Sequence, residues 1–134
     1  MASDRLRDFL KDDLSCLLRF DKATERWLGH CLDLDLVTSA KTEAAAWDNL
    51  RKTIKAHVEL CWKRDREALR RNRAPQADWD LFKHLQGKGE GRRDKIVFDL
   101  LEPELVGGPI WVEALESPMG IDCGKAATGF QAVH

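Results

Sequence analysis

Residues 14–62 contain four aspartates, which are the first side chains that could do chemistry: Asp21, Asp33, Asp35 and Asp48. A nuclease that uses divalent metal needs several such carboxylates converging on one ion. Asp33 and Asp35 have the spacing of a turn that ends a strand, and Asp48 is expected to face solvent on a helix. The spacing therefore favours structural roles for these acids over a metal-dependent nuclease.

Histidine and cysteine side chains are the second candidates, because together they could hold zinc. His57 and Cys61 are four residues apart and would share one face of a helix, while His30 and Cys31 are adjacent. Adjacent strand residues point to opposite faces, so only one of that pair could join, and Cys16 would have to be the fourth ligand. We therefore expect no metal and mostly buried, reduced thiols, since the four cysteines form no CxxC pair.

A basic segment, residues 63–73, is the third candidate. It holds six Lys or Arg and two acids, and a continued helix would place most of its cations on one side. Such a face could contact the phosphates of RNA or DNA. A solvated helix extension and contact with an acidic protein patch are the two alternatives. The candidate nucleic-acid-binding residues are Lys63, Arg66, Arg70, Arg71 and Arg73.

Other catalytic patterns are missing from the sequence. It contains no Ser-His-Asp order, phosphate-binding glycine loop or nucleotide fingerprint, so we expect a non-catalytic protein without a cofactor. The 134 residues are 43% hydrophobic and 34% charged, which is typical of one folded domain. With no apolar run of about 18 residues and a charged start, we expect a cytoplasmic protein without a membrane partner.

Charge is distributed unevenly around a net value of −1. Residues 1–50 hold 7 basic and 10 acidic side chains, residues 51–95 hold 14 and 7, and residues 96–134 hold 1 and 6. Such asymmetry is found on surfaces that bind nucleic acid or charged partners, and also on ordinary solvated helices.

Three short apolar runs precede the candidate helix, at residues 14–20, 26–32 and 36–39. Each is bounded by turn-forming residues, and the third is rich in branched side chains, so we expect an antiparallel three-stranded meander. Gly29 lies inside the second run, where a glycine indicates close approach of another element.

The clearest periodic signal predicts a helix over residues 42–62. Thr42 can cap its start, and apolar side chains recur at intervals of three and four along one face. They are Trp47, Leu50, Ile54, Val58 and Cys61. Beyond Trp62 the stripe stops, so we expect the helix to project past the core into solvent over residues 63–73.

Weaker signals fill the rest of the chain. We expect a short helix at residues 3–12, a second helix capped by Asp78, a flexible loop at 87–91, and strands at 96–101 and 109–112. Trp79, Phe82 and Leu85 would share a face of that second helix. Residues 117–134 have no periodicity, which favours an irregular tail.

The order of these features resembles the N-terminal domain of HicB-type antitoxins over residues 14–62. The resemblance is carried by an aromatic second strand with Trp27, an acidic break, Val37 and Thr38, and a helix that begins at Thr42 with alanines. Ala45 stands where the family has the acid of its capping box. Ala40 and Lys41 stand before the threonine where the family has a Gly-Asp-like turn.

The resemblance implies an α+β, partial RNase H-like fold that is often oligomeric and covers a small RNA-cleaving HicA-like toxin. We therefore expect a HicB-like domain at residues 1–116, with a basic helical extension (63–95) and a tail (117–134). The acidic turn and Trp27 are the expected partner-binding residues: Asp33, Asp35 and Trp27. A homo-oligomer is expected because a short meander leaves unpaired strand edges. The alternative is a solitary HicB-like protein that binds nucleic acid and has no toxin partner.

Overall fold

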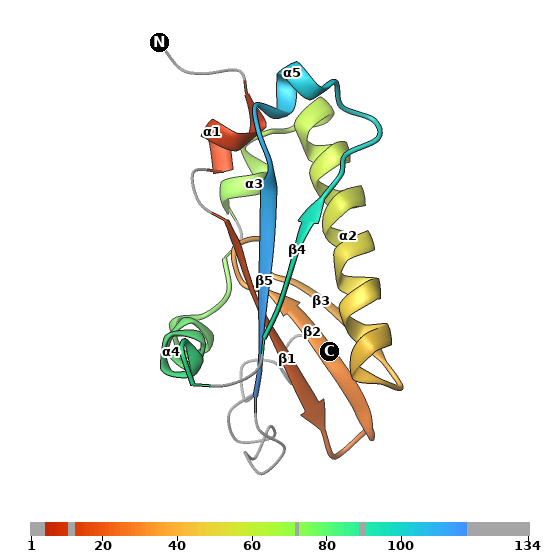
Figure 1. The fold of residues 1–134 in the computed structure, drawn as a ribbon, viewed down its shortest axis with the longest axis vertical. Helices are drawn as coiled ribbons and strands as arrows, with labels where there is room; N and C mark the ends of the chain where they lie inside the picture. The colour runs from red at the N-terminus through yellow and green to blue at the C-terminus, as the bar shows by residue number, and fades with distance from the viewer. Residues whose placement is uncertain (1–4, 11–12, 72, 89–90, 118–134) are drawn as a thin grey trace.

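A five-stranded mixed sheet runs through the centre of the α+β fold (Figure 1). The computed structural model describes residues 5–10, 13–71, 73–88 and 91–117. The strand order is β3-β2-β1-β5-β4, and the pairing of β1 with β5 is parallel whereas the other pairings are antiparallel. The strands are β1 (Leu14–Asp21), β2 (Arg26–Cys31), β3 (Leu36–Ala40), β4 (Gly91–Ile96) and β5 (Ile110–Glu116).

The predicted meander is confirmed as β1, β2 and β3. Cross-strand partners such as Phe20 and Trp27 set its register, and their rings meet edge to face with centroids 5.7 Å apart. Both connecting turns contain a residue with positive φ, Glu25 at 55° and Asp35 at 50°. Aspartate tolerates this left-handed conformation better than most residues, so Asp35 suits the tight β2–β3 turn.

The predicted helix is confirmed as α2 (Glu43–Arg64). The Thr42 hydroxyl accepts a hydrogen bond from the Ala45 backbone N–H (3.1 Å), as the expected cap requires. All five residues of the apolar stripe are buried against one face of the sheet. Gly29 allows this close approach, because a Cβ there would lie only 3.2 Å from the Ala46 carbonyl oxygen and from the Leu50 Cβ.

The predicted solvent extension of this helix was wrong. α2 ends at Arg64, Asp65 leaves the helical conformation (φ −152°), and the short helix α3 (Ala68–Arg71) folds back over the core. Burial of Leu69 accounts for the turn, since this one apolar side chain is only 3% exposed. The predicted N-terminal helix is present as α1 (Leu6–Leu10), and its Phe9 ring meets the Trp62 ring edge to face at 5.5 Å.

The opposite face of the sheet carries α4 (Gln76–Leu85) (Figure 1). Its Phe82 and Leu85 pack with residues of β1, β5 and the end of β2, in a second apolar cluster that Trp79 joins from the side. The prediction that Asp78 caps this helix was wrong. Pro75 occupies the N-cap, and Asp78 points into the protein as the partner of a buried arginine.

The predicted strand at residues 96–101 was also wrong. β4 precedes it, and the chain then turns, with Val97 and Leu100 more than 60% exposed. β4 is a charged edge strand that pairs with β5, and its Arg92 and Asp94 form ion pairs with Glu43 and Arg51 of α2. The expected strand at 109–112 is confirmed as part of β5, preceded by α5 (Pro103–Val106).

The predicted tail lies mostly outside the described residues. Of the predicted tail, only Ser117 is described, and its backbone N–H donates to the Leu18 carbonyl (2.9 Å); residues 118–134 lie outside the described residues. Within the described ranges, no helix is long and apolar enough to cross a bilayer.

Candidate functional site

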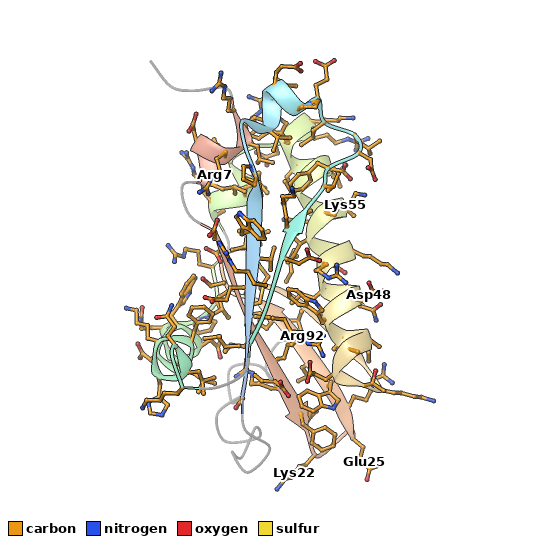
Figure 2. All side chains as sticks on the ribbon, viewed as in Figure 1. Arg7, Lys22, Glu25, Asp48, Lys55 and Arg92 are labelled. Carbon is orange, nitrogen blue, oxygen red and sulfur yellow. The ribbon has the colours of Figure 1, made fainter. Side chains whose placement is uncertain are left out.

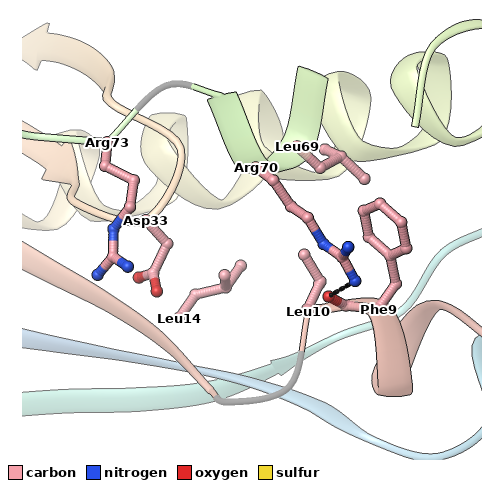
Figure 3. A pocket seen from close by; sticks show the side chains of 7 residues that line it. All are labelled: Phe9, Leu10, Leu14, Asp33, Leu69, Arg70 and Arg73. Atoms are coloured by element: carbon pink, nitrogen blue, oxygen red, sulfur yellow. Dashed lines mark hydrogen bonds between the residues drawn. The ribbon is translucent and has the colours of Figure 1, made fainter. Parts of the chain in front are cut away.

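A surface pocket of about 300 Å³ lies at the end of the meander, where α1, the β2–β3 turn and α3 meet (Figure 3). We call it the Phe9 pocket. Its wall combines apolar side chains with charges of both signs. It is lined by Phe9, Leu10, Leu14, Asp33, Leu69, Arg70 and Arg73.

Arg70 is fixed on one wall of the Phe9 pocket by two contacts. Its guanidinium carbon lies 3.6 Å from the centroid of the Phe9 ring, and a terminal nitrogen donates to the Phe9 carbonyl oxygen (3.1 Å). A guanidinium stacked on a ring keeps N–H groups at its edge, where they can donate to a carboxylate or phosphate. Arg70 therefore presents a positioned cation beside an apolar surface.

Arg73 links the Phe9 pocket to a second one. The Ala74 backbone N–H donates to the Leu32 carbonyl (2.9 Å), which holds the segment after α3 beside the β2–β3 turn. The Arg73 guanidinium lies 4.5 Å from the Trp79 ring on α4. We call this second pocket, which has a volume of about 450 Å³, the Trp79 pocket. It is lined by Arg73, Ala74, Gln76, Trp79 and Lys83.

The predicted basic residues do not share one face. Arg66 stacks on the Trp62 ring (3.8 Å) and donates to the Trp62 carbonyl, and Arg71 forms an ion pair with Asp65. Lys63 is exposed near the end of α2. The expectation of a single cationic helix side was wrong, because the chain leaves the helix at Asp65. Of the five candidates, Arg70 and Arg73 line the pockets.

The predicted partner-binding acids lie two residues apart in the β2–β3 turn. Asp33 is half-buried and accepts a hydrogen bond from the Ser15 backbone N–H (2.6 Å), while Asp35 is exposed and bonded to the His30 ring (2.7 Å). Trp27 is half-buried and packs against the core under α2. The structure thus brings Asp33, but not Asp35 or Trp27, to the Phe9 pocket with Arg70 and Arg73.

A buried polar network lies between the sheet and α4. Arg19 is 1% exposed, and its guanidinium donates to Asp78 (3.2 Å) and to His30 Nδ1 (3.3 Å). A guanidinium can only donate, so Nδ1 must accept, and the proton of neutral His30 must sit on Nε2, where it is donated to Asp35. The network therefore links β1, β2, α4 and the β2–β3 turn, and sequence reasoning missed it. Its only signal was an arginine inside the apolar run at 14–20.

His30 makes stability depend on pH. Burial lowers the pKa of His30 below its ordinary value of 6.5, although the hydrogen bond to Asp35 opposes this shift. As pH falls through 6.5 the unfolded chain binds a proton that the folded chain accepts only at lower pH. We therefore expect His30 to cost no stability above pH 6.5. As pH falls below 6.5 and through the folded-state pKa, the free energy of unfolding should decrease.

Urea unfolding between pH 7.5 and 5 would measure this dependence. His30→Gln should flatten the slope, because glutamine does not titrate. His57, whose pKa burial also lowers, contributes its own part, so His57→Gln should remove a separate portion. An unchanged slope in His30→Gln would contradict this assignment.

The candidate zinc ligands are divided between the two faces of the sheet. Cys16 and Cys31 lie side by side in the core under α2, and burial raises the pKa of the Cys16 thiol well above its usual range. His57 and Cys61 are near each other on α2 (Nε2 to Sγ 3.6 Å), whereas His30 faces Arg19 on the α4 side. Within the described ranges, no three His, Cys, Asp or Glu side chains gather as a metal site.

The remaining predicted acids have local roles. Asp21 accepts hydrogen bonds from the Ala23 backbone and the Thr24 hydroxyl in the β1–β2 turn. Asp48 pairs with Arg51 and Lys52 on the outer side of α2. These contacts agree with the structural roles expected from the sequence.

The chain matches no family model, no curated protein and no solved structure.

Proposed function

We propose that the chain is a non-catalytic binding protein of the HicB-like kind, which docks onto and neutralises a small HicA-like RNA-cleaving toxin. The observation that carries this proposal is the meander–helix unit of β1, β2, β3 and α2. It has the element order that the resemblance implies, with Trp27 in its second strand and Thr42 capping its helix. In this proposal the unit is a partial RNase H-like framework with the β2–β3 turn at one corner.

The β2–β3 turn supports the proposal because its carboxylates are held in place before any partner arrives. Asp33 is fixed by the Ser15 backbone and Asp35 by His30. Binding of a partner then costs less conformational entropy, because these two side chains are already ordered. Exposed Asp35 would meet the cationic surface of a basic RNA-binding toxin, and charge attraction of this kind mainly speeds association.

Co-expression with the product of a small adjacent gene tests the proposal. We expect growth arrest to be relieved and the two chains to co-purify. In binding kinetics at low salt, Asp35→Asn should slow association more than it speeds dissociation, because the amide oxygen can still accept from His30 while the charge is lost. Glu25→Gln is the matched control, since Glu25 is an exposed acid in the β1–β2 turn (Figure 2).

Two results would count against the toxin partner. They are failure of the pair to associate at micromolar concentration, and equal slowing by Asp35→Asn and Glu25→Gln. The alternative, a solitary nucleic-acid-binding protein, is favoured by a different observation, the stacking of Arg70 and Arg73 on aromatic rings beside pockets. A homo-oligomer remains part of the proposal: β1 of the meander is paired with β5, but β3 is left at the edge of the sheet.

A further inference from the structure

We propose that the Phe9 pocket and the Trp79 pocket form one site for single-stranded nucleic acid, with Arg73 at their junction. Arg73 lines both cavities, so they adjoin at this side chain. The site shares Asp33 with the β2–β3 turn, but its cations come from α3, the segment after it and α4, so it does not depend on the toxin proposal.

Charge favours an anionic ligand at this site. The two linings together contain three cations, Arg70, Arg73 and Lys83, and one carboxylate, Asp33. The carboxylate accepts a hydrogen bond from the Ser15 backbone N–H, and the cations outnumber it three to one. Phosphate groups suit the guanidinium N–H donors of Arg70 and Arg73, because one guanidinium can donate two parallel hydrogen bonds to two phosphate oxygens.

Aromatic side chains favour a nucleic acid whose bases are accessible. Phe9 lines one pocket and Trp79 lines the other, and each ring lies next to an arginine. Proteins that bind single strands combine a cationic path for the backbone with rings or guanidinium planes on which bases stack. A duplex hides its base faces and could use only the cations. Cavities of about 300 and 450 Å³ are within the usual range for ligand-binding pockets.

Another basic pocket on the protein lacks these features. Its volume is also about 300 Å³, but among the described residues its lining is aliphatic and charged, without an aromatic side chain. Its Arg51 is paired with Asp48 and Asp94, and its Lys55 with Asp99. Cations already neutralised within the chain release fewer counterions on binding, so the site at Arg73 is the better candidate.

Fluorescence anisotropy of a labelled oligouridylate of about twelve nucleotides, titrated with the full chain, tests the proposal. We expect binding that weakens steeply with salt. Arg73→Gln should weaken it and reduce the slope of log K against log salt by about 0.7, the value for one phosphate contact on a single strand. Arg71→Gln is the matched control, because Arg71 is paired with Asp65 and lines neither pocket.

Base stacking is tested at Trp79. Trp79→Leu should weaken binding about tenfold with little change in the salt slope, whereas Trp79→Phe should retain most of the affinity. Circular dichroism of each variant checks that the fold is intact. A duplex of equal length should bind more weakly than the single strand.

Three outcomes would overturn the proposal. They are no binding at low salt, equal losses in Arg73→Gln and Arg71→Gln, or binding of oligoglutamate as tight as that of oligouridylate with no effect of Trp79→Leu. The last result would assign the site to an acidic protein partner. The toxin proposal can fail or succeed separately, because its test measures a complex with another protein.

Discussion

Replacing Arg19 by methionine is expected to lower the free energy of unfolding by about 3–5 kcal/mol, the usual cost of removing one partner of a buried ion pair. The change leaves the Asp78 carboxylate, whose side chain is only 10% exposed, without the guanidinium that faces it at 3.2 Å. It also removes the donor to His30 Nδ1. Urea unfolding followed by circular dichroism measures the loss. Lys22→Met in the exposed β1–β2 turn is the control and should change stability by less than about 0.5 kcal/mol.

A double variant separates the ion pair from other effects of the same change. If the buried carboxylate causes most of the loss, Arg19→Met combined with Asp78→Leu should be destabilised by less than the sum of the single losses, by about 0.5–3 kcal/mol. Strictly additive losses would show that Arg19 and Asp78 act independently. This result would contradict the role assigned to the pair.

The β2–β3 turn connects the buried network with the candidate surface site. Asp35 is bonded to His30 inside the network, whereas Asp33, two residues earlier, lines the Phe9 pocket. Leu34 between them is 2% exposed and belongs to the main core. The position of the Asp33 carboxylate in the pocket therefore depends on the same core packing and hydrogen bonds that hold Asp35.

The meander and α2 could be predicted from sequence because their signals are local. A stripe such as Leu50, Ile54 and Val58 is set by helix geometry alone, and Thr42 caps the helix from one turn away. β4 could not be predicted in the same way. Its residues, Gly91–Ile96, are mostly charged and form a strand because β5 pairs with them and α2 supplies opposite charges.

The candidate site was predictable only in part, because its contacts join distant segments. Arg70 and Arg73 could be identified as cations, but the ring under Arg70 belongs to Phe9, 61 residues earlier. The chain turns back at Asp65 and thereby brings Arg70 to Phe9. In the sequence, only the apolar Leu69 within the charged segment indicated this turn. Arg19 and Asp78 are 59 residues apart, so neither spacing nor periodicity could pair them.

Truncating Ile54 to alanine is expected to lower the free energy of unfolding by about 2–5 kcal/mol. Ile54 is fully buried in the middle of α2, in the core cluster that also contains Leu18 and Cys31 of the meander. The lost methyl groups remove apolar burial and leave a cavity that the sheet beneath cannot fill without moving. Leu60→Ala is the matched control, since Leu60 is on the same helix but 54% exposed. Thermal and urea unfolding of both variants should place the large loss in Ile54→Ala alone. Equal small losses would contradict the packing of this face of α2 against β1 and β2.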